Sequence, residues 1–157
     1  MAKTYRIKWD KRAGVAANAR RQLPPMVTAY FSSVREFLAN DAPPPSLHRV
    51  RLASKRLRYT LELFRPCYPA GLEERLDMLK KLQDGLGEVN DAVASGTLLR
   101  AALKRQPKAR KFLEDRAGEK AAQVVRYWKE TFDAEGQEAW WTDFLAHHAR
   151  PPGHSRA

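Results

Sequence analysis

Apolar side chains recur at intervals of three and four residues through most of the chain, and clusters of proline and glycine separate the periodic stretches. These intervals place side chains on one face of an α-helix, whereas a strand requires an alternation that no stretch sustains. The pattern therefore predicts an all-α fold, a four-helix bundle of long amphipathic helices with a short C-terminal helix. We assign residues 1–149 to this single domain and residues 150–157 to a flexible tail.

The first helical segment is expected from about Asp10 to Asn40, with Pro24 and Pro25 inside it. Proline lacks the backbone N–H and its ring clashes with the preceding turn, so we expect a kink or two helices here. The stretch Asp41-Ala-Pro-Pro-Pro45 forms a stiff connector, after which Ser46 is expected to cap the next helix.

Three further helices and a short final one follow from the same periodicity. They are expected at Leu47 to Phe64, Leu72 to about Leu103, Lys108 to about Ala134, and around Trp140 to Leu145. Gly85 and Gly87 lie inside the third of these stretches. A glycine inside a helix costs about 1 kcal/mol relative to alanine, so we expect a neighbouring helix to approach closely there.

The second helix separates an apolar face from a cationic one. Its apolar face consists of Val50, Ala53, Leu57, Leu61 and Phe64. On a helical wheel the opposite side carries His48, Arg51, Lys55 and Arg58, with Arg49 and Arg56 on the flank of this basic row. Like charges at this spacing repel one another, so the row indicates a surface that faces a polyanion. His48 would donate a hydrogen bond when neutral and would add a charge when protonated.

Composition agrees with an anionic partner, because 29 Lys and Arg against 18 Asp and Glu give a net charge of +11. This excess favours nucleic acid, an inorganic polyanion or an acidic membrane surface. A basic but inert protein would have the same net charge, although the clustering of the cations argues against that alternative.

Location and redox state follow from what the sequence lacks. The N-terminus has no apolar run typical of a signal peptide, and no segment is long enough to span a bilayer, so we expect a cytoplasmic protein without a membrane partner. The single cysteine, Cys67, excludes an intrachain disulfide and is interpreted as a half-buried thiol.

Motifs for catalysis are missing. The sequence contains no phosphate-binding glycine loop, zinc-ligand spacing or nucleophile elbow, so we expect no enzyme activity, no cofactor and no metal site. His147, His148 and His154 lack Cys or carboxylate partners at ligand spacing, which favours a solvated C-terminus.

The third helix carries carboxylates on one face, since Asp84, Glu88 and Asp91 are separated by four and three residues. Such a face could hold a divalent cation. We prefer the alternative that these carboxylates pair with arginines of the second helix and fix their direction. Lys80 lies one turn before Asp84 and is placed beside the basic row, whereas Lys81 could equally be solvated.

Two stretches are long enough to indicate a family. They are His48-Arg-Val-Arg-Leu-Ala-Ser-Lys-Arg-Leu-Arg-Tyr-Thr-Leu-Glu-Leu-Phe64 and Leu79-Lys-Lys-Leu-Gln-Asp-Gly-Leu-Gly-Glu-Val-Asn-Asp-Ala-Val93. Together they closely resemble the CHAD domain, the conserved histidine α-helical domain. The resemblance implies an all-α protein that binds inorganic polyphosphate through a basic surface without catalysis, in some cases on polyphosphate granules.

The resemblance also implies roles for individual residues, because both motifs match the family pattern in type. Together with the basic row, it predicts a polyphosphate-binding set of His48, Arg49, Arg51, Lys55, Arg56, Arg58, Lys80 and Lys81. The second motif also includes Gln83. The expected structural braces are Asp84, Asn90 and Asp91.

One departure from the family pattern concerns copy number. The usual CHAD domain contains two related bundles whose basic helices face each other across a groove, and this chain has one clear copy that resembles the second. Either half a groove suffices, or a homodimer or a second CHAD-like half completes it. Two alternatives belong to other functional classes. One is a nucleic-acid-binding helical module, although the sequence contains no helix-turn-helix signature. The other is a metal-assisted phosphate-chain enzyme. A structural coat protein on granules is compatible with binding.

Overall fold

The computed structural model of the chain describes residues 4–153, and this range is helical without a β-strand. Five α-helices form the fold, which confirms the all-α prediction. They are α1 (Val15–Ala39), α2 (His48–Leu63), α3 (Gly71–Leu98), α4 (Pro107–Tyr127) and α5 (Gln137–His147). Short 3₁₀ turns, η1 (Pro44–Leu47) and η2 (Arg65–Cys67), flank α2, and a π-helical segment, η3 (Trp128–Phe132), continues α4. None of these helices is long and apolar enough to cross a membrane.

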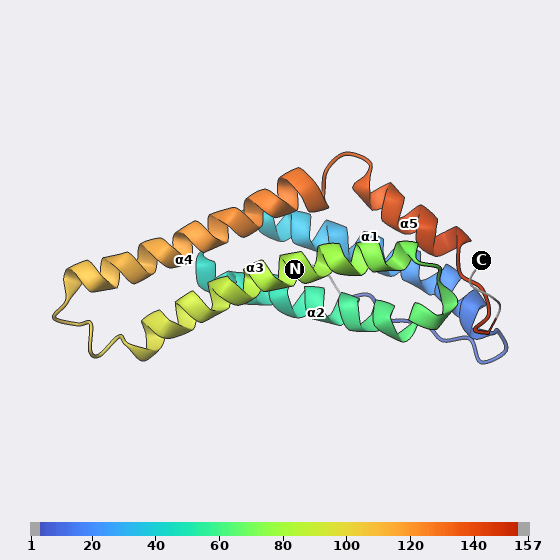
Figure 1. The fold of residues 1–157 in the computed structure, drawn as a ribbon, viewed down its shortest axis with the longest axis horizontal. Coiled ribbons are helices and arrows are strands. Elements are labelled where there is room, and N and C mark those ends of the chain that lie inside the picture. The colour runs from blue at the N-terminus through green and yellow to red at the C-terminus, as the bar shows by residue number, and fades with distance from the viewer. Residues whose placement is uncertain (1–3, 154–157) are drawn as a thin grey trace.

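The helices form an elongated bundle (Figure 1). α3 lies against both α2 and α4, and α5 runs along α1 as a full member of the bundle. The distal part of α3 and the beginning of α4 project together beyond the other helices as a hairpin (Figure 1). We call residues 98–113 at its end the hairpin tip.

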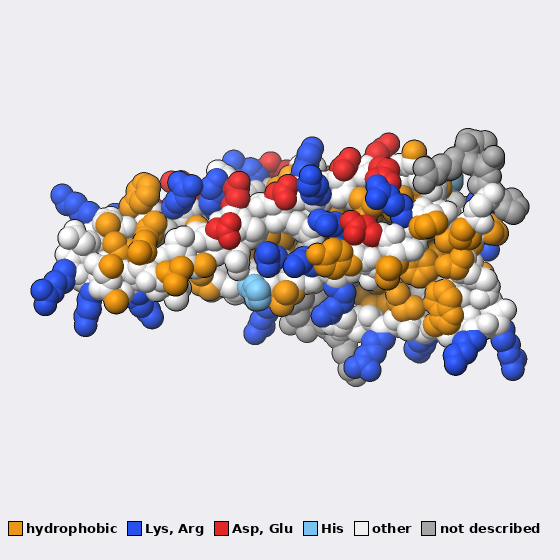
Figure 2. Space-filling view, turned by 60° about the horizontal axis from the view of Figure 1, so that its bottom comes forward, with side chains coloured by type: hydrophobic (Ala, Val, Ile, Leu, Met, Phe, Trp, Pro, Cys, Tyr) orange, Lys and Arg blue, Asp and Glu red, His pale blue; other side chains and the backbone are white. Residues whose placement is uncertain are grey.

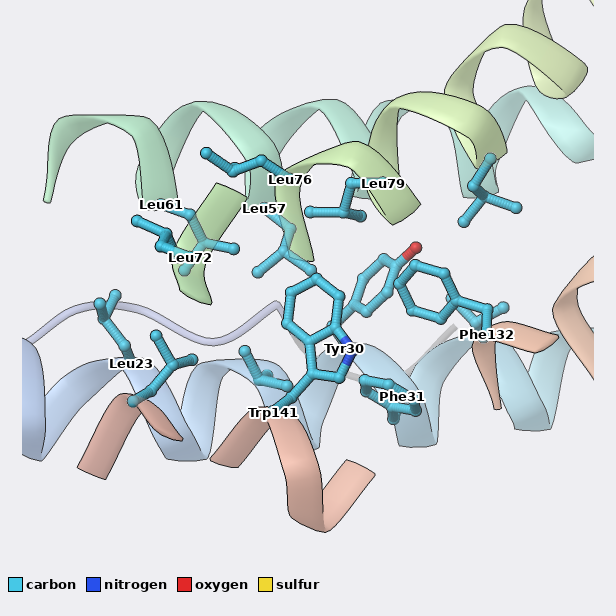
Figure 3. Close-up of a cluster of buried hydrophobic side chains, with 14 of the residues drawn as sticks. Leu23, Tyr30, Phe31, Leu57, Leu61, Leu72, Leu76, Leu79, Phe132 and Trp141 are labelled. Atoms are coloured by element: carbon cyan, nitrogen blue, oxygen red, sulfur yellow. The ribbon is translucent and has the colours of Figure 1, made fainter. Parts of the chain in front are cut away.

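An aromatic cluster fills the core where α1, η3 and α5 meet (Figure 3). Phe31, Trp128, Phe132 and Trp141 are fully buried. Trp128 stacks on Phe132 with 4.8 Å between the ring centroids. Because η3 and α5 supply most of these rings, the C-terminal third of the chain completes the core that α1 begins.

The first helix differs from its prediction in two ways. It begins at Val15 rather than near Asp10, because the buried side chain of Asn18 hydrogen-bonds the backbone of residues 10–14 and holds it in a turn. It also runs through Pro24 and Pro25 as one helix rather than two. Leu23 and Val27 on either side of the prolines are fully buried, so the same core holds both halves in line.

The N-terminus of α2 also differs from the prediction. Ser46 does not cap this helix, because it lies inside η1, where its hydroxyl donates to Pro43 O at 2.6 Å. The helix begins at His48 with no side-chain cap. The predicted third helix is shorter than expected and ends at Leu98 rather than Leu103, while the fourth changes to π-helix at Trp128.

Cys67 is fully buried rather than half-buried, and burial raises the pKa of its thiol. Arg150, placed in the flexible tail by the sequence, instead donates its backbone N–H to Cys67 O at 2.7 Å. His154 and the rest of the predicted tail beyond residue 153 lie outside the described residues. The chain is therefore held against the bundle at least as far as Arg150.

Arg75 is a buried cation on α3 that was not singled out from the sequence. Its side chain is buried between the rings of Trp140 and Phe144, with the guanidinium carbon 3.5 Å and 3.9 Å from the two centroids. The guanidinium donates to Gly71 O and Trp140 O, and burial lowers its pKa to about 10. It therefore remains charged at neutral pH and ties α3 to α5 through cation–π contacts.

The two glycines inside α3 have different surroundings. A Cβ atom at Gly85 would lie 2.9 Å from Val124 Cγ2 of α4, which confirms the predicted close approach at this position. A Cβ atom at Gly87 would meet nothing within 4 Å, so the same prediction is wrong there.

We expect Gly87→Ala to raise the free energy of unfolding by about 0.5–1 kcal/mol, because alanine gains helix propensity without a steric conflict. Urea denaturation measures this change. Gly85→Ala is the matched variant, and its stability should rise less because the new methyl group must displace Val124. Equal gains for the two variants would contradict the contact with α4.

Candidate functional site

The cations of α2 do not form one continuous surface. Two basic rows lie on opposite flanks of the helix, and an apolar ridge separates them. The first row consists of Arg51, Lys55 and Arg58, and the second of Arg49 and Arg56. On the exposed face that carries α2, Lys and Arg side chains are interspersed with hydrophobic ones (Figure 2).

The first row lies on the flank of α2 that faces α3, and its three side chains are partly buried. Arg58 donates to Gln83 Oε1 of α3 at 2.5 Å and to Glu62 Oε1, one turn away on α2, at 3.1 Å. These two bonds fix the direction of the guanidinium and leave other N–H donors free. The first row therefore ends in a positioned arginine, which is preceded along the helix by two further cations.

The apolar ridge consists of Leu52, Tyr59 and Leu63, which lie between the two basic rows. All three are exposed, with Tyr59 at 51% and Leu63 at 79%. The Tyr59 ring is within cation–π distance of Lys55 and Arg58. This ridge was not predicted from the sequence, although the seven-residue step from Leu52 to Tyr59 and the four-residue step to Leu63 place all three on one helix face.

The second row borders an open groove between α1 and α2 with a volume of about 380 Å³. Arg49 and Arg56 line this groove together with the N-terminal segment. The guanidinium of Arg56 donates to Thr4 Oγ1 at 3.2 Å. The segment is itself held by Gln22 of α1, whose Oε1 accepts from the Tyr5 hydroxyl at 2.8 Å. The second row thus belongs to the α1 side of the molecule.

The two lysines of the second motif lie in different places. Lys80 is exposed and precedes Gln83 by three residues, so it shares the flank of α3 that contacts α2. Lys81 lines a small pocket between α3 and α4, where Glu88 accepts from Lys120 at 2.9 Å. Since α4 covers the opposite flank of α3, the structure places Lys80 beside the first row and Lys81 away from it.

The predicted braces differ from the observed ones. Within residues 4–153, the side chains of Asp84, Asn90 and Asp91 make no hydrogen bond or ion pair, and both aspartates are exposed. Asp84 and Asp91 follow Asp77 at steps of seven, which keeps them on the outer face of α3 rather than on the flank near α2. Gln83 makes the brace instead, and its spacing from Lys80 and Asn90 was the available signal.

The described part of the chain contains no group of three or more His, Cys, Asp or Glu side chains close enough to hold a metal ion. Glu88 pairs with Lys120 of α4 rather than with an arginine of α2, the partner that was expected from the sequence. His147 bonds the carbonyl oxygen of Asp143 through Nδ1, and His148 stacks on Phe144. Both histidines therefore make local contacts at the C-terminal end of α5.

Comparison with known proteins gives one family. The model of the CHAD domain matches residues 6–100, a range that contains α1, α2 and α3 and therefore both basic rows and Gln83. Neither the curated proteins nor the solved structures include a significant match. The matched range covers more than half of the chain, and the chain belongs to the CHAD domain family.

Proposed function

We propose that this protein binds inorganic polyphosphate, without catalysis, through the first basic row of α2 and Lys80 of α3. The observation that carries the proposal is the pairing of Arg58 with Gln83 and Glu62, which holds a guanidinium in place beside Lys55 and Arg51. A cation that is already positioned loses less conformational entropy when a phosphate group binds it. Family membership supports the same ligand.

The chemistry of the ligand matches the first row. Polyphosphate carries a negative charge on every unit and has no base to be read, so its recognition requires closely spaced Arg and Lys. Arginine can bind phosphate oxygens through two parallel hydrogen bonds, while lysine acts as a mobile point charge. Arg51, Lys55 and Arg58 extend along about 10 Å of the helix axis, at 1.5 Å per residue, which allows several neighbouring phosphates to be contacted at once.

The proposed role is binding alone, in the cytoplasm and in association with polyphosphate granules, with no cofactor. Incubation of the protein and magnesium with polyphosphate of defined length, followed by analysis of chain length, tests this part. We expect unchanged chains. Shortened chains would instead support a metal-assisted phosphate-chain enzyme.

A second basic wall is proposed to come from another subunit, either a second copy of this chain or another CHAD-like half. The first row lies on a single helix, and the chain has one clear copy of this basic helix where the usual CHAD domain has two. Light scattering with and without polyphosphate measures the mass of the complex. A dimer is expected, at least in the complex, and a monomer that binds polyphosphate at full affinity would overturn this assembly.

Titration with polyphosphates of several defined lengths at two salt concentrations tests the ligand itself. Counterion release should dominate the affinity, so binding should weaken steeply as salt increases. Long-chain polyphosphate should also withstand competition by duplex DNA or RNA at equal phosphate concentration. Displacement by either nucleic acid would contradict the proposal.

Tyr59 favours a second candidate, a ligand that carries nucleobases. Its ring is exposed among cations, and proteins that bind single-stranded nucleic acids stack bases on aromatic side chains in this setting. Tyr59→Leu distinguishes the two ligands because it keeps the apolar bulk and removes the ring. Polyphosphate affinity should stay within about twofold, whereas stacking is worth about 1–3 kcal/mol per base, so a large loss of single-stranded RNA binding would support this candidate.

A substitution at Glu62 is expected to increase the affinity for polyphosphate rather than to decrease it. Glu62→Gln removes a negative charge beside the first row and keeps an amide oxygen that can still accept from Arg58 Nε. We expect polyphosphate to bind several-fold more tightly at low salt, with the gain decreasing as salt screens the charge. Fluorescence anisotropy with labelled polyphosphate measures it, and Glu36→Gln on α1 serves as a charge-matched control. A weaker Glu62→Gln complex would show that aiming Arg58 outweighs the repulsion.

A further inference from the structure

The hairpin tip combines a high density of positive charge with exposed apolar side chains. It carries six cations and no acidic residue, and all six cations are exposed. They are Arg100, Lys104, Arg105, Lys108, Arg110 and Lys111. Among residues 4–153, the tip contains one ion pair, a 4.0 Å contact between Arg110 and Glu114. The tip is therefore a concentrated and almost uncompensated positive charge.

Large apolar side chains are exposed on the same tip. Leu98 is 84% exposed, Phe112 64% and Leu99 45%. In Figure 2, the end of the molecule formed by the hairpin shows hydrophobic atoms surrounded by Lys and Arg. Exposed hydrophobic groups gathered at a projecting end indicate a site of interaction rather than scattered surface positions.

From this combination we propose that the hairpin tip binds the surface of an anionic lipid bilayer. Lys and Arg near the surface of such a bilayer are attracted by its negative potential, and apolar side chains beside them can enter the boundary between headgroups and acyl chains. No membrane-spanning helix is required, because the tip would lie on the bilayer. The absence of an apolar span, on which the expectation of no membrane partner rested, does not argue against this mode.

Other occupants fit the tip less well. A free polyanion such as polyphosphate would satisfy the cations and leave Leu98 and Phe112 in water. Two copies meeting tip to tip would bring twelve like charges together, from six on each copy, which opposes association. A bilayer with anionic headgroups complements both the charge and the apolar side chains. The proposal does not depend on the proposed function, because the tip lies outside the first basic row.

Co-sedimentation with vesicles tests the proposal, using vesicles of phosphatidylcholine with and without phosphatidylglycerol. The full chain should sediment with the anionic vesicles at low salt and should be released by high salt. It should not sediment with vesicles of pure phosphatidylcholine. The variant Leu98→Ser/Phe112→Ser keeps every charge and should lose about tenfold in affinity for anionic vesicles, or more, from the lost apolar contacts. Its polyphosphate affinity should not change, which separates this test from that of the proposed function.

Leu63→Ser is the matched control, because Leu63 is equally exposed on α2 and far from the tip along the chain. It should sediment like the unchanged protein. The proposal is wrong if the protein does not sediment with anionic vesicles, if the tip variant sediments undiminished, or if Leu63→Ser loses as much. A tip variant that instead loses polyphosphate or RNA affinity would assign the tip to a free polyanion. A change from dimer to monomer in that variant would assign it to contact between copies.

Discussion

Replacing Arg51, Lys55 and Arg58 by alanine should lower the affinity for polyphosphate at least about a hundredfold. Each charge-assisted hydrogen bond to a phosphate contributes about 1.5–3 kcal/mol, and three such groups are removed together. The slope of log affinity against log salt should become shallower by about 2, since each lost phosphate contact contributes about 0.7 for a single-stranded polyanion. Helicity should persist, because alanine is the strongest helix former and none of the three side chains belongs to the core.

The matched control is Lys104→Ala/Lys108→Ala/Lys111→Ala, which removes the same net charge from the hairpin tip. Circular dichroism and anisotropy titrations should be run on both triple variants. If both lose equal affinity, polyphosphate responds to net charge rather than to the first row. A separate Gln83→Ala variant should give a smaller loss, because Arg58 would keep its charge and its contact with Glu62 while losing its partner on α3.

The largest effect on stability is expected from Phe132→Ala, which should lower the free energy of unfolding by about 3–5 kcal/mol. The ring is fully buried, stacks on Trp128 and lies 5.4 Å, between centroids, from both Phe31 and Trp141. Its removal would leave a cavity between α1, η3 and α5. The shift in the midpoint of urea denaturation measures the loss.

Phe112→Ala is the control for the same substitution at an exposed site. Phe112 lies on the hairpin tip at 64% exposure, so its replacement should change stability by no more than about 0.5 kcal/mol. Similar losses for the two variants would mean that Phe132 does not pack as the structure shows. The comparison also tests whether a segment beyond residue 100, outside the match to the CHAD model, is needed for the stability of the matched helices.

The sequence predicts the helices well because their apolar spacing is long and regular. The limits of α2 were predicted to within one residue, since the prolines around it stop the helix on both sides. The start of α1 was missed by five residues, because it depends on the tertiary role of Asn18 rather than on the pattern around Asp10. The unbroken course through Pro24 and Pro25 likewise follows from burial on both sides.

The sequence predicted which cations lie on α2, but not how the other elements are arranged around them. The wheel of α2 identified the cations correctly, but it could not show that α3 covers one flank and the N-terminal segment approaches the other. For the same reason, the sequence could not show which residue of α3 contacts Arg58. Asp84 and Gln83 are adjacent in the chain, and only the packing angle between α2 and α3 decides that the amide, rather than the carboxylate, reaches Arg58.

The apolar ridge of Leu52, Tyr59 and Leu63 has a consequence for stoichiometry. A single anionic strand bound along Arg51, Lys55 and Arg58 would have to cross the ridge to reach Arg49 and Arg56, and the ridge offers it no donors apart from the Tyr59 hydroxyl. If the second row also bound polyphosphate, its strand would be separate from the one on the first row, and one protein would bridge two long strands. With long polyphosphate, this valency would make the protein a cross-linker whose mixtures become turbid near charge balance.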